Sequence, residues 1–185
     1  ISPVSAATPV SGTISEITRW ALADSPFQVT GHVTVAAGVT LTIDPGVTVK
    51  FDSGKVLEVE GTLVARGTSS DQITFTSSAA SPAAGDWGYI KFKDSSSDAT
   101  FDGNGDYAGG SIMEYCSVFY GGGIGNIESV GAVLSDNAAP FITKSTFEYS
   151  VSWAVYLIPE VAFKFTDNTV DSNAVKIGDG IAYPI

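Results

Sequence analysis

Short runs of alternating apolar and polar residues recur along the first half of the chain. In the clearest runs Val, Leu, Ile or Phe alternates with Thr, Lys or Glu, at residues 33–35, 39–43, 47–51, 57–59 and 73–76. An alternation with a period of two and one apolar face is typical of a half-buried β-strand. The pattern therefore predicts an all-β protein built from very short strands.

The segments between these runs are tight corners. Glycine closes the corners at residues 36–38, 44–46 and 52–54, and no Asn-Gly hairpin turn separates these runs. A simple antiparallel meander is therefore disfavoured. A chain that turns so often can coil, with each strand pairing in parallel with the strand one circuit later. We expect a parallel β-helix, or β-solenoid, of about seven rungs with roughly 20 to 25 residues each.

The two ends of the chain break this pattern. Residues 1–13 are small and polar and contain Pro3 and Pro9, and proline has no backbone N–H to donate. We expect an extended N-terminal arm at 1–13 and a single β-helix domain at 14–185. No amphipathic helix follows the last apolar positions at 181–185, so we expect an open C-terminal rung. Such a rung favours end-to-end contact with another copy, or continuation in a longer parent protein.

Composition and charge restrict the classes of function. Hydrophobic residues make up 44% of the 185 residues and charged residues 16%, which excludes a disordered chain. Twenty acidic residues against nine Lys and Arg give a net charge of −11, which would repel nucleic acid. One cysteine excludes an internal disulfide framework. No run approaches the roughly 20 apolar residues of a membrane span. The low lysine content and the Ser-, Thr- and Gly-rich composition favour an extracellular or cell-surface location.

The early rungs resemble a known family. The sequences SPFQVTG at 25–31, VTLTIDPGVTVKF at 39–51 and LEVEGTL at 57–63 resemble the first rungs of right-handed parallel β-helix proteins of the pectate-lyase-like superfamily. The likeness is to the version common on bacterial and archaeal surface proteins, and it continues at 72–77, 87–92, 139–147 and 165–170. It implies a right-handed β-helix over most of residues 25–177. It does not select a function, because this fold carries lyases, hydrolases, adhesins and passive stalks.

One local motif has the residue types of a calcium site. Asp102, Asn104 and Asp106 place oxygen ligands at alternate positions between glycines, which suits a hard cation such as calcium. It is not an EF-hand, because Tyr107 replaces the glycine of that loop and Met113 replaces its closing glutamate. The alternative is a solvated glycine-rich loop between rungs. Further candidate ligands are Asp94, Asp98 and Glu114.

The sequence offers no catalytic constellation. A polysaccharide lyase needs an Arg or Lys that abstracts a proton beside clustered acids, and a hydrolase needs a pair of carboxyl groups. The residues weighed for these roles are Arg19, Arg66, Lys91, Lys93, Lys144, Glu58, Glu60 and His32. Outward lysines on strands are usually solvated, and the two glutamates share a face without an obvious partner acid. An enzyme is therefore the less favoured interpretation.

Aromatic residues concentrate in the later half of the chain. They are Tyr115, Phe119, Tyr120, Tyr149, Trp153 and Tyr156. Exposed aromatic rows can stack against sugar rings, but burial tendencies favour placing many of these residues in the axial core.

Two functional hypotheses are consistent with the sequence. The first is a non-enzymatic extracellular structural β-solenoid, which assembles head-to-tail into a filament or forms part of a surface stalk or adhesin. Its partners would be further copies of itself or cell-surface components. The alternative is a carbohydrate-binding module or a calcium-dependent polysaccharide lyase that acts on an acidic glycan.

Overall fold

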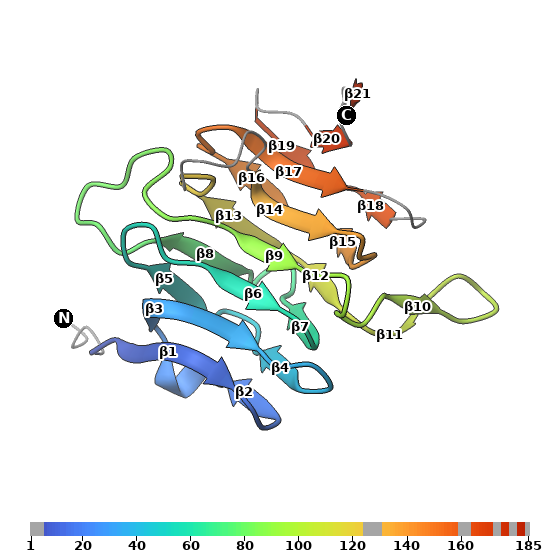
Figure 1. Ribbon diagram of the computed structural model, residues 1–185, viewed down its shortest axis with the longest axis horizontal. Helices are drawn as coiled ribbons and strands as arrows, with labels where there is room; N and C mark the ends of the chain where they lie inside the picture. Colours follow the sequence, from blue (N-terminus) through green and yellow to red (C-terminus); the bar gives the residue numbers. More distant parts are fainter. Residues whose placement is uncertain (1–5, 124–130, 159–163, 172–174, 178–180, 184–185) are drawn as a thin grey trace.

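The chain coils into a right-handed parallel β-helix (Figure 1). The computed structural model describes residues 6–123, 131–158, 164–171, 175–177 and 181–183. Within these residues the strands form three stacks, and successive circuits give seven rungs. Both the parallel β-helix and the expected number of rungs are confirmed.

Each stack contains one strand, or part of one, from successive rungs. The first stack contains β1 (Thr8–Ile14), β3 (Phe27–Val35), β5 (Thr48–Phe51), β8 (Ile73–Ser77), β13 (Cys116–Phe119), β16 (Thr146–Glu148) and β19 (Thr169–Val170). The ends of β1 and β3 continue into the second stack, which adds β6 (Leu57–Val59), β9 (Ile90–Phe92), β14 (Gly131–Asp136), β17 (Trp153–Ile158) and β20 (Val175–Ile177). The third stack contains β2 (Thr18–Trp20), β4 (Thr40–Ile43), β7 (Thr62–Arg66), β12 (Ile112–Glu114), β15 (Phe141–Thr143) and β18 (Lys164–Thr166).

The remaining elements lie outside this parallel pattern. β21 (Ile181–Tyr183) pairs antiparallel with β20, and η1 (Leu22–Asp24) is a single 3-10 turn. β10 (Thr100–Phe101) and β11 (Tyr107–Gly109) form an antiparallel hairpin that projects from the solenoid (Figure 1). No helix in the described part of the chain is long and apolar enough to span a membrane.

Alternate side chains of each strand fill the space between the stacks. Phe27, Val49 and Phe75 occupy equivalent register positions on three consecutive strands and are buried. Neighbouring strands lie about 4.8 Å apart, so these side chains stack along the solenoid axis. Trp87 packs its ring against Phe51, with ring centroids 4.2 Å apart. The predicted apolar faces of the early strands thus form one continuous core.

Residues 8–13 of the expected N-terminal arm are extended and belong to the solenoid. Residues 8–14 form β1, which pairs in parallel with β3. The expected boundary between residues 13 and 14 falls inside this strand. The apolar side chains of Val10 and Ile14 pack against the core. The described part of the expected arm therefore contributes to the first rung.

One rung is enlarged by insertions. A loop at residues 78–89 joins β8 to β9, and residues 93–111 join β9 to β12. The second insertion contains the β10–β11 hairpin. Its tip includes Asn104-Gly105, a dipeptide that strongly favours a two-stranded turn. The segment expected to be only a loop is therefore a hairpin in part.

Candidate functional site

Side chains on the outer face of the third stack lie in two rows. The first row is Val64, Ile112, Phe141 and Lys164. The second row is Arg66, Glu114, Thr143 and Thr166. The first row is mostly apolar, and Ile112 is fully buried although it faces away from the axis. Another part of the chain must therefore cover the first row.

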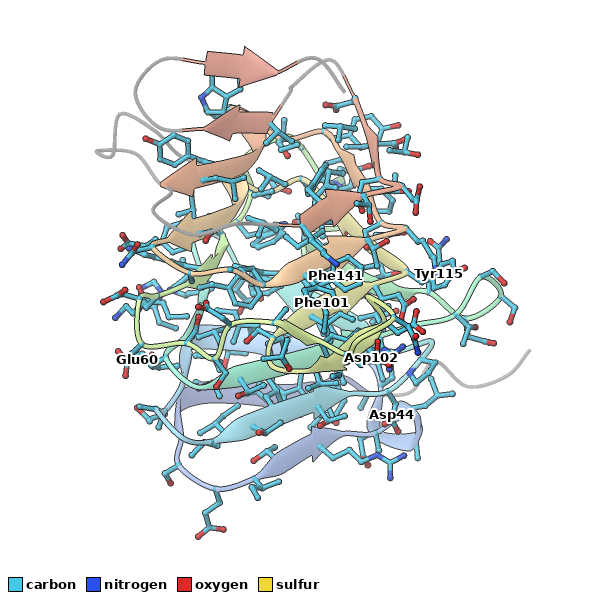
Figure 2. The ribbon with its side chains drawn as sticks, turned by 90° about the vertical axis from the view of Figure 1, so that its right-hand side faces the viewer. Asp44, Glu60, Phe101, Asp102, Tyr115 and Phe141 are labelled. Carbon is cyan, nitrogen blue, oxygen red and sulfur yellow. The ribbon has the colours of Figure 1, made fainter. Side chains whose placement is uncertain are left out.

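The β10–β11 hairpin packs against the first row. Phe101 meets Phe141 edge to face, with ring centroids 5.2 Å apart, and Tyr107 stacks on Phe141 at 6.5 Å. The Lys164 ammonium lies 3.4 Å from the centroid of the Phe101 ring. Figure 2 shows Phe101 beside Phe141 near the middle of this face, with Tyr115 toward one edge. Aromatic and cation–π contacts of this kind each stabilise by about 0.5–2 kcal/mol, and they hold the hairpin against the solenoid.

A groove of about 420 Å³ lies between the hairpin and the second row. One wall is the hairpin, with Asp106 and Tyr107. The floor is the second row together with Phe141. Two residues of the next corners, Lys144 and Asp167, close the far side. The groove therefore has an aromatic wall, hydroxyl groups and charges of both signs.

Glu114 forms ion pairs with both cationic side chains of the groove. Its Oε2 accepts from the Arg66 guanidinium, with Nη2 at 2.8 Å and Nε at 2.9 Å. Its Oε1 lies 3.1 Å from Nζ of Lys144. The Arg66 guanidinium also lies over the Tyr107 ring, and the Lys144 ammonium lies over Tyr115. Both cations are thus held between a shared carboxylate and an aromatic ring.

These contacts and burial shift the pKa values of Glu114, Lys144 and Tyr107. Burial by itself would raise the pKa of Glu114, but the hydrogen bonds from Arg66 and Lys144 outweigh burial and lower it. The hydrogen bond to Glu114 raises the pKa of Lys144. Burial raises the pKa of Tyr107, whose hydroxyl donates to the carbonyl oxygen of Gly110 at 2.6 Å. At neutral pH the groove therefore contains an ionised Glu114, a protonated Lys144 and a neutral Tyr107.

The lowered pKa of Glu114 predicts a pH dependence of stability. A carboxyl group whose pKa falls on folding stabilises the protein above its unfolded pKa, and this stabilisation is lost as the pH falls through the folded pKa. We expect Glu114→Gln to lower the free energy of unfolding at pH 7 and to converge with the wild type on acidification. Urea denaturation at a series of pH values measures this difference. Glu16→Gln, at an exposed position, is the control, and an equally pH-dependent effect there would contradict the assignment.

The structure places the expected calcium ligands at the tip of the hairpin. Oδ1 of Asp102 accepts backbone N–H groups from Asn104 at 2.9 Å and Asp106 at 3.0 Å. This carboxylate oxygen therefore already stabilises the turn. Among the described residues, no three His, Cys, Asp or Glu side chains gather in a metal-binding arrangement.

Calcium takes about six to eight oxygen ligands, which include carboxylates, carbonyl groups and waters, so a site at the tip would use ligands in addition to the three expected side chains. Of the further candidates, Asp94 accepts from Asn137, Asp98 accepts from the backbone of Ala139, and Glu114 lies in the groove. Calcium binding stays a prediction, which calorimetric titration of the wild type and Asp102→Asn with calcium chloride would test.

The other candidate catalytic residues lie in several separate parts of the molecule. Lys93 contacts both Glu58 and Glu60, at 3.2 and 3.0 Å, on the outer face of the second stack. Figure 2 shows Glu60 on the opposite side from Tyr115, away from the groove. Lys91 pairs with Asp136, Arg19 pairs with Asp44, and His32 is exposed on β3. Of the candidate catalytic residues, Arg66 and Lys144 alone line the groove.

The expectation that many of the later aromatic residues fill the axial core is wrong. None of the six is a buried member of the main core, although Tyr120 packs against it in part. Tyr156 is buried in a separate outer cluster with Tyr89 and Leu134. Tyr149 is 52% exposed and stacks on Tyr120 at 5.1 Å. These aromatic residues lie at corners or on outward-facing strand positions, so their side chains do not point into the axial core.

Comparison with known proteins supports the same fold. Residues 12–132 match the family model described as a pectate-lyase-like β-helix domain. No curated protein and no solved structure gives a significant match. The matched region contains the hairpin and the Arg66 and Glu114 part of the groove, but not Phe141 or Lys144.

Proposed function

The chain belongs to the family of pectate-lyase-like β-helix domains, and we propose that it is a non-enzymatic extracellular β-solenoid that binds a glycan, as part of a cell-surface stalk or adhesin. The observation that carries this proposal is the groove between the hairpin and the third stack. Aromatic faces pack well against sugar rings, and a few placed polar groups orient them. The groove combines Tyr107 and Phe141 with the hydroxyl groups of Thr143 and Thr166.

The electrostatics of the groove favour binding over cleavage. A lyase needs an unprotonated base beside its substrate, and a hydrolase needs a protonated acid. The contact with Glu114 raises the pKa of Lys144 and keeps it protonated, and the lowered pKa of Glu114 keeps that carboxylate ionised. A protonated Lys144 cannot act as the base of a lyase, and an ionised Glu114 cannot act as the protonated acid of a hydrolase.

We expect the purified protein to bind at least one polysaccharide without cleaving it. Affinity electrophoresis against immobilised polysaccharides would identify the ligand, and assays for new reducing or unsaturated sugar ends would test cleavage. Tyr107→Ala removes part of the aromatic wall and is expected to weaken binding about tenfold or more, equivalent to about 1.4 kcal/mol.

Tyr149→Ala is the matched control for that variant. It removes an exposed tyrosine from a different corner and is expected to leave glycan affinity unchanged. If Tyr149→Ala removed binding and Tyr107→Ala did not, the ligand would sit on the Tyr120–Tyr149 corner instead. Release of sugar ends that Lys144→Gln abolished would show that the protein is an enzyme.

End-to-end assembly has a separate supporting observation. A second groove, of about 350 Å³, lies at the first rung, where the side chains of Val10, Ile14 and Trp20 meet. Ile17, next to this groove in the chain, is 85% exposed. An apolar groove at one end of a solenoid suits contact with the end of another copy.

If the protein assembles in this way, light scattering should show oligomers that grow with concentration. Ile17→Asp should then lower their mass, because a charge would enter the apolar contact. Leu22→Asp, at an exposed apolar position outside the groove lining, is the control. A monomeric wild type at high concentration would remove end-to-end assembly from the proposal without affecting glycan binding.

A further inference from the structure

The charges that line the groove do not balance. Two cationic side chains, Arg66 and Lys144, face three anionic ones, Glu114, Asp106 and Asp167. Both cations contact Glu114, at 2.8 and 3.1 Å. An anionic ligand would therefore have to compete with Glu114 for the cations, and it would also meet Asp106 and Asp167.

The whole molecule adds to this disadvantage for an anion. The chain carries a net charge of −11. Excess charge of one sign slows the approach of ligands with the same sign, most strongly at low ionic strength. A polyuronate, which carries one carboxylate on each sugar, would be repelled both at a distance and inside the groove.

An uncharged sugar fits the same lining without this conflict. Its hydroxyl groups can donate to the carboxylates of Asp106 and Asp167 and can accept from Arg66 or Lys144. On the floor, the hydroxyl group of the exposed Thr166 can donate or accept, and it is hydrogen-bonded at 3.2 Å to the hydroxyl group of the buried Thr143. Tyr107 and Phe141 stack on each other and line the groove with the remaining parts of their rings, which provide apolar contact surface.

We infer that the groove takes a neutral glycan and discriminates against uronate polymers. This inference rests on the proposed function, that the groove binds a glycan. It replaces the acidic glycan of the alternative hypothesis with an uncharged one, because Arg66 and Lys144 already have an anionic partner in Glu114.

The test compares neutral and acidic oligosaccharides of equal length. Calorimetric titrations would use hexamers of neutral β-glucan, xylan and mannan beside hexagalacturonate and hexamannuronate, at low and at physiological salt. We expect at least one neutral hexamer to bind at least tenfold more tightly than either uronate. A uronate that bound more tightly than every neutral hexamer would overturn the inference and leave glycan binding intact. If no hexamer bound, the proposed function would fail and the inference with it.

A charge-altered variant tests the cause of the discrimination. The double variant Asp106→Asn with Asp167→Asn makes the groove lining net positive. We expect it to strengthen uronate binding at least fivefold relative to the wild type, with a smaller change for the neutral hexamer. Glu16→Gln with Asp24→Asn removes two charges at exposed positions outside the groove lining and is the control. An equal gain in that control would show that net charge, and not the groove, sets the preference.

Discussion

Replacing Trp87 with alanine is expected to lower the free energy of unfolding by about 3–5 kcal/mol, the usual cost of removing a large aromatic side chain from a core. Trp87 is fully buried and stacks on Phe51 at 4.2 Å with an interplanar angle of 12°. Its indole N–H donates to the carbonyl oxygen of Phe119 at 2.8 Å. The substitution would therefore leave a cavity and an unpaired carbonyl group. Urea denaturation measures the loss.

Two further variants separate the loss of buried ring volume at Trp87 from the loss of its hydrogen bond and from the removal of an exposed ring. Trp87→Phe keeps most of the ring volume but removes the N–H donor, so it is expected to cost less than Trp87→Ala. Tyr149→Ala removes an aromatic ring that is 52% exposed, and it is expected to cost about 1 kcal/mol or less. A cost below about 1 kcal/mol for Trp87→Ala would contradict the central packing role of this side chain.

The early rungs could be predicted because one physical pattern dominates them. Between residues 33 and 59, the alternating runs are three to five residues long and the corners between them are short. The apolar face and the parallel pairing follow directly from that alternation. Leu41 and Leu63, for example, lie opposite each other in the third stack and are both fully buried.

The groove could not be predicted in the same way, because its residues come together through register and an insertion. Arg66 lies opposite Glu114 on neighbouring strands although 48 residues separate them in the chain. The insertions at 78–89 and 93–111 lengthen that separation, and the second one supplies the groove wall. The Asn104-Gly105 dipeptide is the sequence signal for the hairpin, but the same residues also fit a calcium loop or a solvated glycine-rich loop.

The corners explain why average burial tendencies do not apply to several of the later tyrosines. Tyr115, Tyr120 and Tyr149 have backbone φ angles of 50°, 66° and 59°, a left-handed conformation that is unusual for a bulky residue. A residue at such a corner leaves the alternation of the strands beside it. Average burial tendencies therefore predict the wrong environment for these tyrosines, whereas they apply well to Phe51 and Phe75, which lie on strands and are fully buried.

Replacing Gly110 with alanine is expected to abolish glycan binding while the solenoid stays folded. Gly110 follows β11 at the base of the hairpin, with a φ of +86°. A Cβ atom there would lie 1.9 Å from the carbonyl oxygen of Asp98. The left-handed conformation costs alanine about 1–2 kcal/mol, and the overlap with backbone adds about 1–3 kcal/mol. The base of the hairpin must therefore shift, which moves Tyr107 away from Phe141 and opens the groove.

Gly103→Ala is the matched control for this variant. Gly103 lies at the tip of the same hairpin, and a Cβ atom there would meet nothing within 4 Å. The same chemical change is therefore expected to leave glycan affinity and stability nearly unchanged. Calorimetric titration with the bound glycan measures affinity, and circular dichroism measures the retained β-structure. If Gly110→Ala bound the glycan as tightly as Gly103→Ala does, the hairpin would not form a wall of the binding site. The ligand would then contact the solenoid alone.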